Sequence, residues 1–128
     1  MVEKKNTIRD YRDLIVWKEA MDLAERTYVL TRTFPKEEMF GLTSQMRRCS
    51  TSIPANIAEG FGRQQRRSFV QFLRIAQGSL KELESHSILA CRVGLLDKLA
   101  LEEIENRCEL LGKRLVTFIR SLNVAEER

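Results

Sequence analysis

The sequence predicts an all-α protein, an antiparallel up-down-up-down four-helix bundle. Three observations support this prediction. Apolar residues recur every three or four positions through four long stretches, only two prolines and six glycines interrupt the 128-residue chain, and short connections separate the stretches. This period is typical of helices that pack nearly parallel to one another, and no stretch shows the alternation of a half-buried strand.

Composition is typical of a single globular domain. Hydrophobic residues make up 43% of the chain and charged residues 31%, which distinguishes it from a disordered protein. The length is sufficient to bury a core without metals or disulfides. We therefore expect one domain over residues 1–128, with its core in about residues 11–122 and loose ends at residues 1–10 and 123–128.

The first helix is expected from Leu14 to Tyr28. One apolar stripe with spacings of three and four residues is expected to face the core. It consists of Leu14, Trp17, Met21, Ala24 and Tyr28. A second stripe lies beside it and widens the apolar face: Val16, Ala20, Leu23 and Leu30. Trp17 and Tyr28 are interpreted as core residues that need no ligand to explain them.

The second helix is expected to follow Pro35 and to run to about Gly60. Proline cannot continue a helix but can open one, and the glutamates behind it suit the positive end of a helix dipole. The core-facing residues of this helix are expected to be Leu42, Met46, Cys49, Ile53 and Asn56. Gly60 and Gly62 are predicted to end the helix and to supply the backbone freedom of a tight turn.

Pro54 and Asn56 are unusual inside a core helix. Pro54 removes a backbone donor and is expected to kink the helix, and the hydroxyls around it can bond the carbonyls so released. Asn56 must find a partner, because an unpaired buried amide costs roughly 1–3 kcal/mol. We interpret both residues as structural, as parts of a kinked core helix with a local polar patch.

The third helix is expected to begin near Arg66 and to be broken at Gly94, and the fourth helix follows. The core-facing positions of the third helix are Phe69, Leu73, Ala76, Leu80, Leu83, Ser87 and Ala90. Those of the fourth are Leu101, Ile104, Cys108, Leu111, Leu115, Phe118 and Leu122. Gly78 and Ser79 are small residues beside the third stripe, and we interpret them as sites of close helix contact.

Three segments carry a resemblance to a known family: "LIVWKEAMDLAERTY", "FPKEEMFGLTSQMRRCSTSIPANIAEG" and "FLRIAQGSLKELE". They resemble the four-helix-bundle proteins encoded in intervening sequences of bacterial 23S rRNA genes, over roughly residues 11 to 120. The resemblance implies a small cytosolic bundle, and related bundles assemble as cyclic homopentamers. Similar bundles are accessory subunits of reverse transcriptases in diversity-generating retroelements, where a basic surface contacts RNA and the enzyme.

Residues for catalysis or metal binding are few. His86 is the single histidine, and Glu82 four residues before it does not match the Glu-x-x-His pairs of di-iron bundles. We interpret His86 as a solvated or interface residue and expect no metal and no cofactor. A metal-dependent nuclease would need clustered inward carboxylates, and the four core-facing stripes contain none. We therefore expect no enzymatic activity.

The cysteines and the apolar runs bear on the cellular compartment. Cys49, Cys91 and Cys108 are far apart, odd in number and without a CxxC pair, which favours a reducing compartment over a disulfide framework or a zinc site. The first residues lack the apolar stretch of a signal peptide, and no run is long enough to span a membrane. We expect a cytoplasmic protein that does not enter the membrane.

Charge is distributed unevenly along the chain. The formal net charge is +4. Residues 82–109 carry seven acidic and three basic residues, whereas residues 39–81 carry one acidic residue, Glu59, and seven basic ones. The basic residues are Arg47, Arg48, Arg63, Arg66, Arg67, Arg74 and Lys81. Arginine guanidinium groups can fork onto phosphates or carboxylates.

Three interpretations of this polarity remain open. The arginines could form a face for the RNA or DNA backbone, with Arg47, Arg48, Arg63, Arg66, Arg67 and Arg74 as its candidate residues. The basic segment of one subunit could instead meet the acidic segment of its neighbour and close a ring, or the charges could simply be solvated. Aromatic residues are not interleaved with the arginines, apart from Phe61 and Phe69, so sequence-specific base recognition is not expected.

From these features we expect a non-catalytic, homo-oligomeric accessory or scaffold protein that binds nucleic acid weakly. Extra apolar positions outside the core-facing stripes favour an oligomer: Val70, Ile75 and Ile88, besides the second stripe of the first helix. The family resemblance makes a pentamer the first choice and a reverse transcriptase one protein partner to consider. The alternatives are a purely structural ring without nucleic acid and, among enzymes, an RNA-processing nuclease.

Overall fold

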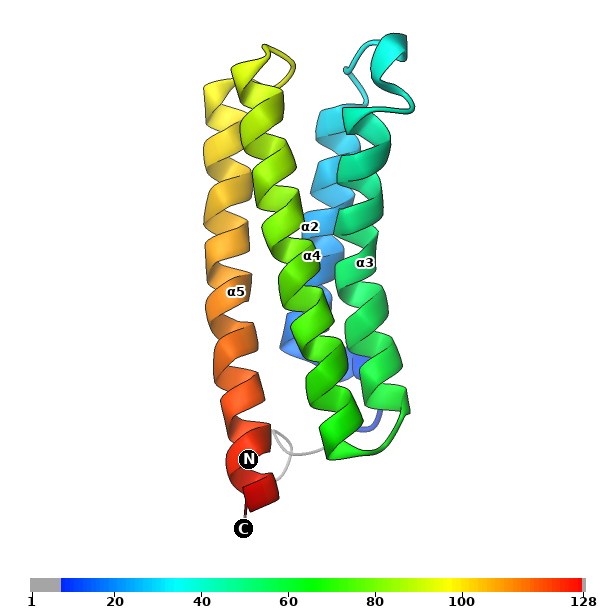
Figure 1. The fold of residues 1–128 in the computed structure, drawn as a ribbon, viewed down its shortest axis with the longest axis vertical. Coiled ribbons are helices and arrows are strands. Elements are labelled where there is room, and N and C mark those ends of the chain that lie inside the picture. The colour runs from blue at the N-terminus through cyan, green and yellow to red at the C-terminus, as the bar shows by residue number, and fades with distance from the viewer. Residues whose placement is uncertain (1–7, 128) are drawn as a thin grey trace.

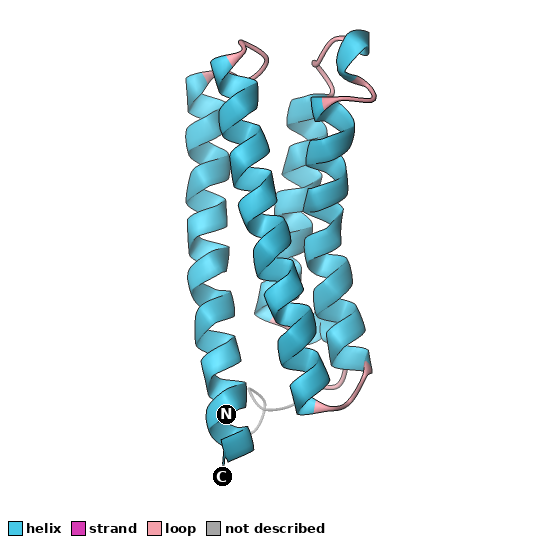
Figure 2. Ribbon diagram, in the orientation of Figure 1, coloured by secondary structure: helices cyan, strands magenta, loops and turns pink. Residues whose placement is uncertain are grey.

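The computed structural model describes residues 8–127 as four long helices in an antiparallel bundle (Figure 1). The long helices are α2 (Ile15–Thr31), α3 (Leu42–Gly62), α4 (Arg66–Arg92) and α5 (Lys98–Glu127), and two short 3₁₀ turns are η1 (Tyr11–Asp13) and η2 (Lys36–Glu38). Neighbours in the chain are neighbours in space, and α5 closes the bundle against α2. Figure 2 shows helices and loops only in this part of the chain, so the predicted fold is confirmed.

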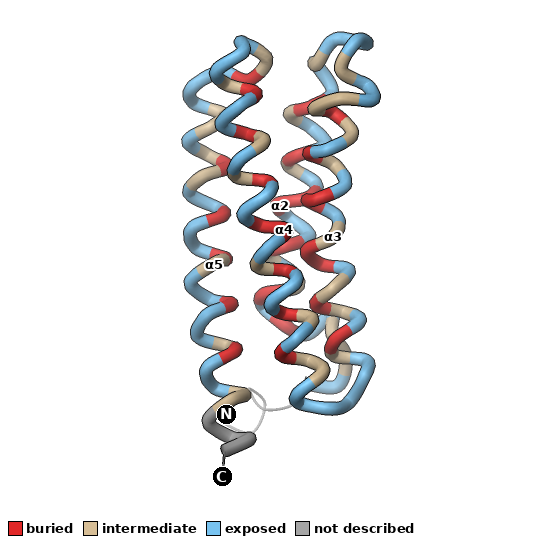
Figure 3. Tube along the Cα trace, viewed as in Figure 1, coloured by how far each residue is buried: buried red, intermediate tan, exposed pale blue. Residues whose placement is uncertain are grey.

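The core runs along the bundle axis, where the red positions of Figure 3 face one another. The large apolar side chains that are fully buried in the described part of the chain include Leu23, Met46, Ile53, Ile57, Leu73, Leu80, Leu83, Ile104, Leu111 and Leu115. The predicted core-facing stripes of the third and fourth helices are confirmed, since their members are buried or packed against the core. Gly94, at φ +86, ends the third helix as predicted.

The core-facing side of α2 differs in part from the prediction. Val16, Ala20 and Leu23 of the second stripe are buried. Leu14 and Ala24 of the first stripe are buried as predicted, whereas Met21 is 43% exposed and Tyr28 40%. The inward side also contains polar Thr27 and Thr31, which are buried because their hydroxyls donate to the carbonyls of Leu23 and Thr27, both at 2.8 Å. A hydroxyl that donates to a carbonyl of its own helix has its hydrogen bond satisfied when it is buried. A search of the sequence for apolar stripes does not identify such buried threonines. Trp17, which was predicted as a core residue, is only partly buried and packs against the core.

The start of α3 also differs from the prediction. Pro35 precedes only the short turn η2, and α3 begins at Leu42. Gly41 separates the two, with φ −110 and ψ −119, outside the helical region. The carboxylate of Glu38 then accepts a hydrogen bond from the Leu42 amide at 3.0 Å, which caps the true helix start.

Gly60 and Gly62 do not supply the turn conformation that the sequence predicted. Both lie within α3, and the left-handed residue of the turn is Gln64, at φ 61. Gly60 is buried because α4 passes directly over it: a Cβ at this position would lie 2.7 Å from the Cβ of Phe72. Gly60 therefore permits close packing of α3 and α4, while a Cβ on Gly62 would meet nothing within 4 Å.

Asn56 finds its partners in a polar contact between α3 and α4. Its amide donates to the carbonyl of Ser52 at 2.8 Å and to the Ser52 hydroxyl at 2.9 Å. The Ser52 and Ser79 hydroxyls lie 2.8 Å apart and join the two helices. The helix continues through Pro54, and the Ser50 hydroxyl donates to the Arg47 carbonyl at 2.9 Å. Asn56 is half-buried at this contact rather than in the core.

The remaining predictions on the fold concern small residues, the chain ends and the membrane. Of Gly78 and Ser79, only Ser79 makes the predicted close contact, because a Cβ on Gly78 would meet nothing within 4 Å.

The predicted loose ends fall partly on residues 1–7 and 128, which lie outside the described residues. Residues 123–127 continue α5. No described helix combines the length and the apolar character needed to cross a membrane.

Gly60→Ala should destabilise the bundle, since the new methyl group overlaps the Cβ of Phe72 and the two helices must separate. Overpacking of this kind costs about 1–3 kcal/mol. Gly62→Ala is the matched control and should be neutral or stabilising by about 0.4–1 kcal/mol. The free energy of unfolding in urea measures both, and equal values for the two variants would contradict the packing role of Gly60.

Candidate nucleic-acid interface

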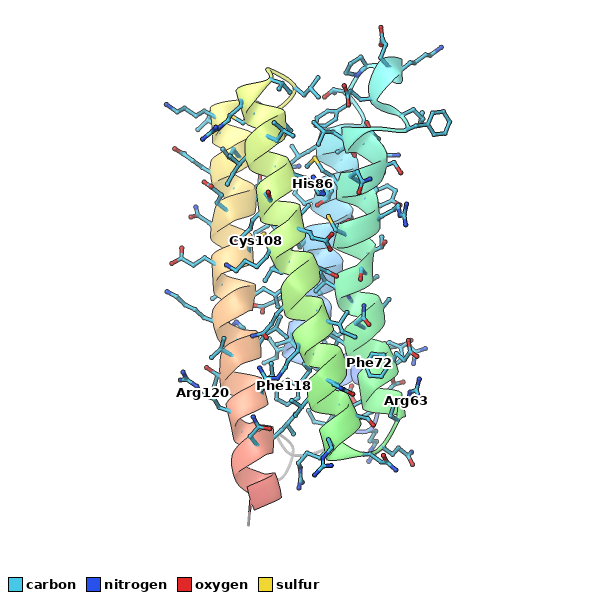
Figure 4. All side chains as sticks on the ribbon, in the orientation of Figure 1. Arg63, Phe72, His86, Cys108, Phe118 and Arg120 are labelled. Atoms are coloured by element: carbon cyan, nitrogen blue, oxygen red, sulfur yellow. The ribbon has the colours of Figure 1, made fainter. Side chains whose placement is uncertain are left out.

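Three of the predicted arginines gather at the end of the bundle where α3 turns into α4. Arg63, Arg66 and Arg67 are exposed there, because the turn separates the two helices by only three residues. Arg63 pairs with Glu59 one helical turn away at 3.0 Å, and its guanidinium lies 5.1 Å from the ring centre of Phe72. In Figure 4 the Arg63 side chain points outward at this end. The turn thus presents a basic tip.

A fourth arginine joins this tip from a distant part of the sequence. Arg9 and Arg66 line a shallow hollow of about 350 Å³ over Phe61 and Phe69. The rings of Phe61 and Phe69 pack edge to face at 5.9 Å. Sequence reasoning missed Arg9, although the antiparallel order of the helices offered a signal: the residues before α2 must lie at the same end as the turn after α3. The hollow brings positive charge beside apolar surface.

Arg47 lies elsewhere and has a structural contact. Its Nε donates to the Thr31 hydroxyl at 2.9 Å, and its guanidinium lies 4.6 Å from the ring centre of Tyr28. Both partners belong to α2. The half-buried Arg47 therefore links the end of α2 to the start of α3, and no pattern in the sequence indicates this contact.

Arg48 and Arg74 are exposed but do not complete the single strip that the sequence suggested. The contact between Ser52 and Ser79 sets the register of α3 on α4. Counting along the helices from this pair, Arg74 lies level with Ile57, nine residues from Arg48 and so about 14 Å along the bundle. The six predicted arginines thus form a tip of three, a tethered Arg47, and two separated positions.

Among the described residues, no group of three or more His, Cys, Asp or Glu side chains is placed to hold a metal ion. His86 is half-buried on α4. A hollow of about 1110 Å³ lies between α4 and α5 and has both signs of charge on its walls. Lys81 pairs there with Glu84 at 3.1 Å and Lys113 with Glu109 at 3.4 Å. These charges neutralise one another and do not extend the basic tip.

A second hollow, about 520 Å³, lies between α2 and α3 and is mostly apolar. Its α2 side is formed by the outward stripe of that helix, and its α3 side by small residues. The lining includes Trp17, Met21, Tyr28, Pro54, Ala55 and Ala58. We call this surface the α2–α3 groove. It adjoins a smaller hollow of about 270 Å³ that includes Arg47 and Arg48.

The three cysteines are free thiols, and two of them are buried. Burial, with a smaller effect from the charge of Glu82, raises the pKa of Cys49 to about 11. Burial, with a smaller effect from Glu84, raises the pKa of Cys108 to about 12. Because the thiolate is the reactive form, both thiols are poor nucleophiles at neutral pH.

The chain is similar to known proteins over most of its length. A family described as 23S rRNA-intervening sequence protein matches residues 12–117. The chain belongs to this family. A crystal structure of a protein of unknown function from the S23 ribosomal protein family of Bacteroides thetaiotaomicron is similar to this intervening-sequence protein, with 28% identity and a TM-score of 0.73. The match covers 82% of this chain and 98% of the other. No functionally curated protein matches the chain.

The raised thiol pKa values predict how stability depends on pH. The folded state holds the Cys49 and Cys108 protons more tightly than the unfolded chain, whose thiols titrate near 9. The free energy of unfolding should therefore fall as the pH rises from about 9 towards 11. Urea titrations at several pH values measure this fall, which should be smaller in a Cys49→Ala, Cys108→Ala double variant. The same fall in both proteins would assign the effect to other groups.

Proposed function

We propose that this intervening-sequence protein is a non-catalytic, cytoplasmic, homo-oligomeric scaffold that binds the backbone of RNA or DNA weakly and without sequence preference. The observation that supports nucleic-acid binding best is the basic tip, with Arg9, Arg63, Arg66 and Arg67 exposed at one end of the bundle. An excess of positive charge, concentrated at one place, attracts polyanions.

The distribution of acidic groups supports the tip as the binding surface. Asp13 accepts hydrogen bonds from the Arg9 and Asp10 amides at 3.0 and 3.2 Å, and Asp10 pairs with Arg12. Glu59 pairs with Arg63, and an exposed pair of this kind is weak enough to exchange for a phosphate. Phosphate contact by Arg63 therefore requires little rearrangement of the bundle.

The family supports RNA as the first nucleic acid to test, because its members are named for sequences that interrupt an rRNA gene. The exposed Met21 and Tyr28 of α2 support a homo-oligomer, and the resemblance to ring-forming bundles makes a pentamer the first choice. A ring of this kind could serve a reverse transcriptase or another protein as an accessory subunit. A ring without nucleic-acid binding is the second candidate function, and the same two α2 residues favour it.

The triple variant Arg63→Gln, Arg66→Gln, Arg67→Gln should bind a labelled RNA more weakly than the parent protein. For every phosphate that the variant no longer neutralises, the slope of log K against log salt should become shallower by about 0.7–0.9. Titrations at several salt concentrations measure both quantities, and light scattering follows the oligomer. Metal-dependent cleavage of the RNA by the pure protein would overturn the non-catalytic assignment.

The matched control removes three positive charges from the opposite end of the bundle, by Arg32→Gln, Arg92→Gln and Lys98→Gln. These residues are exposed where α2 and α4 end and α5 begins. The control should keep most of the affinity and slope, since its charges lie far from the tip. If both triple variants bind with equally reduced affinity, net charge rather than the tip governs binding. If the tip variant keeps its affinity while the oligomer dissociates, its arginines hold subunits together.

A further inference from the structure

The α2–α3 groove has the features of a helix-packing surface that no helix of the described protomer covers. On α2 it presents Trp17, Met21 and Tyr28, which belong to a stripe with spacings of three and four residues. On α3 it presents Ala55 and Ala58, whose small side chains leave room between the helices. Stripes with this spacing are typical of helices that pack side by side. The sequence predicted this stripe as core, and the structure leaves its members Met21 and Tyr28 exposed.

The outward side of α4 carries a second uncovered stripe with the same spacing: Ile75, Gly78, Glu82, Ser85 and Leu89. Ile75 is 50% exposed and Leu89 is 47% exposed. Gly78 lies in the middle of the helix and is exposed, and a Cβ there would meet nothing within 4 Å. Glycine is unfavourable inside a helix, and its common use is close approach of another backbone. Nothing within the described protomer makes that approach.

These two stripes lie at matching heights along the bundle. Counting from the contact of Ser52 with Ser79, Gly78 lies level with Ile53 and Ile75 with Asn56. The contacts of Arg47 with Tyr28 and Thr31 place α2 in the same way, so Met21 lies between the levels of Pro54 and Ile57. The glycine and isoleucine of α4 are therefore level with the part of the groove formed by Met21 and Ala55.

We propose that the α2–α3 groove receives the outward face of α4 from a second copy of this chain. This inference rests on the proposed homo-oligomer and assigns its two contact faces. Ile75 packs between Ala55 and Ala58, and Gly78 allows the backbone of α4 to approach the groove beside Met21. Charge supports the same pairing, because Arg48 in the smaller hollow beside the groove lies level with Leu83, next to Glu82 on the α4 stripe.

The matching heights also restrict the symmetry. The two faces are different surfaces of one protomer, so the contact is heterologous, and such contacts close into a ring or continue as a filament. Residues at equal heights meet only if neighbouring protomers are related by rotation about an axis parallel to the helices, without a shift along it. That relation closes a ring, and it places every basic tip on the same rim.

Single cysteines on the two faces test the assignment. Ala55→Cys and Gly78→Cys are each made in a Cys91→Ser background, where the remaining thiols of Cys49 and Cys108 are buried. The two proteins are mixed, allowed to exchange subunits and oxidised. A disulfide-linked dimer on a non-reducing gel should form in the mixture and in neither protein alone. A chain that carries both substitutions should give a ladder of masses ending at the ring size.

The outcomes separate this assignment from the proposed oligomer. A monomer mass by light scattering at micromolar concentration would overturn both. An oligomer that gives no cross-link in the mixture would overturn only the assignment of faces. Cross-links within either single variant alone would show that a face meets its own copy, and would overturn the heterologous contact.

A substitution without cysteine provides an independent test. Ala55→Arg places a long charged side chain in the groove and should lower the oligomer mass, while circular dichroism remains helical because Ala55 is exposed in the protomer. Asn106→Arg adds the same charge at an exposed position of α5 and should leave the mass unchanged. An unchanged mass for Ala55→Arg would contradict the proposed contact.

Discussion

The close contact between α3 and α4 determines the geometry of the rest of the molecule. At one end the two helices approach over Gly60, where a side chain would collide with Phe72, and further along the Ser52 and Ser79 hydroxyls bond directly. Two fixed contacts on a pair of helices leave no freedom to slide or rotate. The heights of the basic tip, of the outward α4 stripe and of the start of α3 all follow from this one register. Since Arg47 ties α3 to the end of α2, the same register places the α2–α3 groove.

The sequence was sufficient to predict the fold, but it did not predict every face. The inward sides of α4 and α5 were predictable because each helix has one continuous apolar stripe along its length. On α2 two apolar stripes compete, and the buried side of the helix includes Thr27 and Thr31, whose internal hydrogen bonds make them compatible with the core. The conformation at Gln64 and the burial of Gly60 depend on how tightly α4 packs over the turn, which no local pattern encodes.

The candidate site was predictable to the same partial extent. Arg63, Arg66 and Arg67 surround one turn, and chain order alone brings them together. Arg9 joins them through topology, which required the register of distant segments. Arg47 was indistinguishable from Arg48 in the sequence, because the difference between a tethered and a solvated arginine lies in the Thr31 hydroxyl and the Tyr28 ring that it meets. Partners contributed by another helix cannot be deduced from charge spacing.

The basic tip and the uncovered stripes use separate surfaces, and this separation has a functional consequence. A single tip with a few arginines holds a polyanion only weakly at physiological salt, because salt reduces the free energy gained when phosphate contacts release condensed counterions. If copies assemble with every tip on one rim, a nucleic acid that contacts one tip meets the next at high effective concentration, and the overall affinity rises without any new kind of contact. Assembly through α2, α3 and α4 would therefore govern binding at Arg63, Arg66 and Arg67 although none of these arginines needs to touch a neighbouring subunit. In such an arrangement the apolar contacts set the affinity and the arginines set the preference for polyanions, so a change in protein concentration alone would alter nucleic-acid binding.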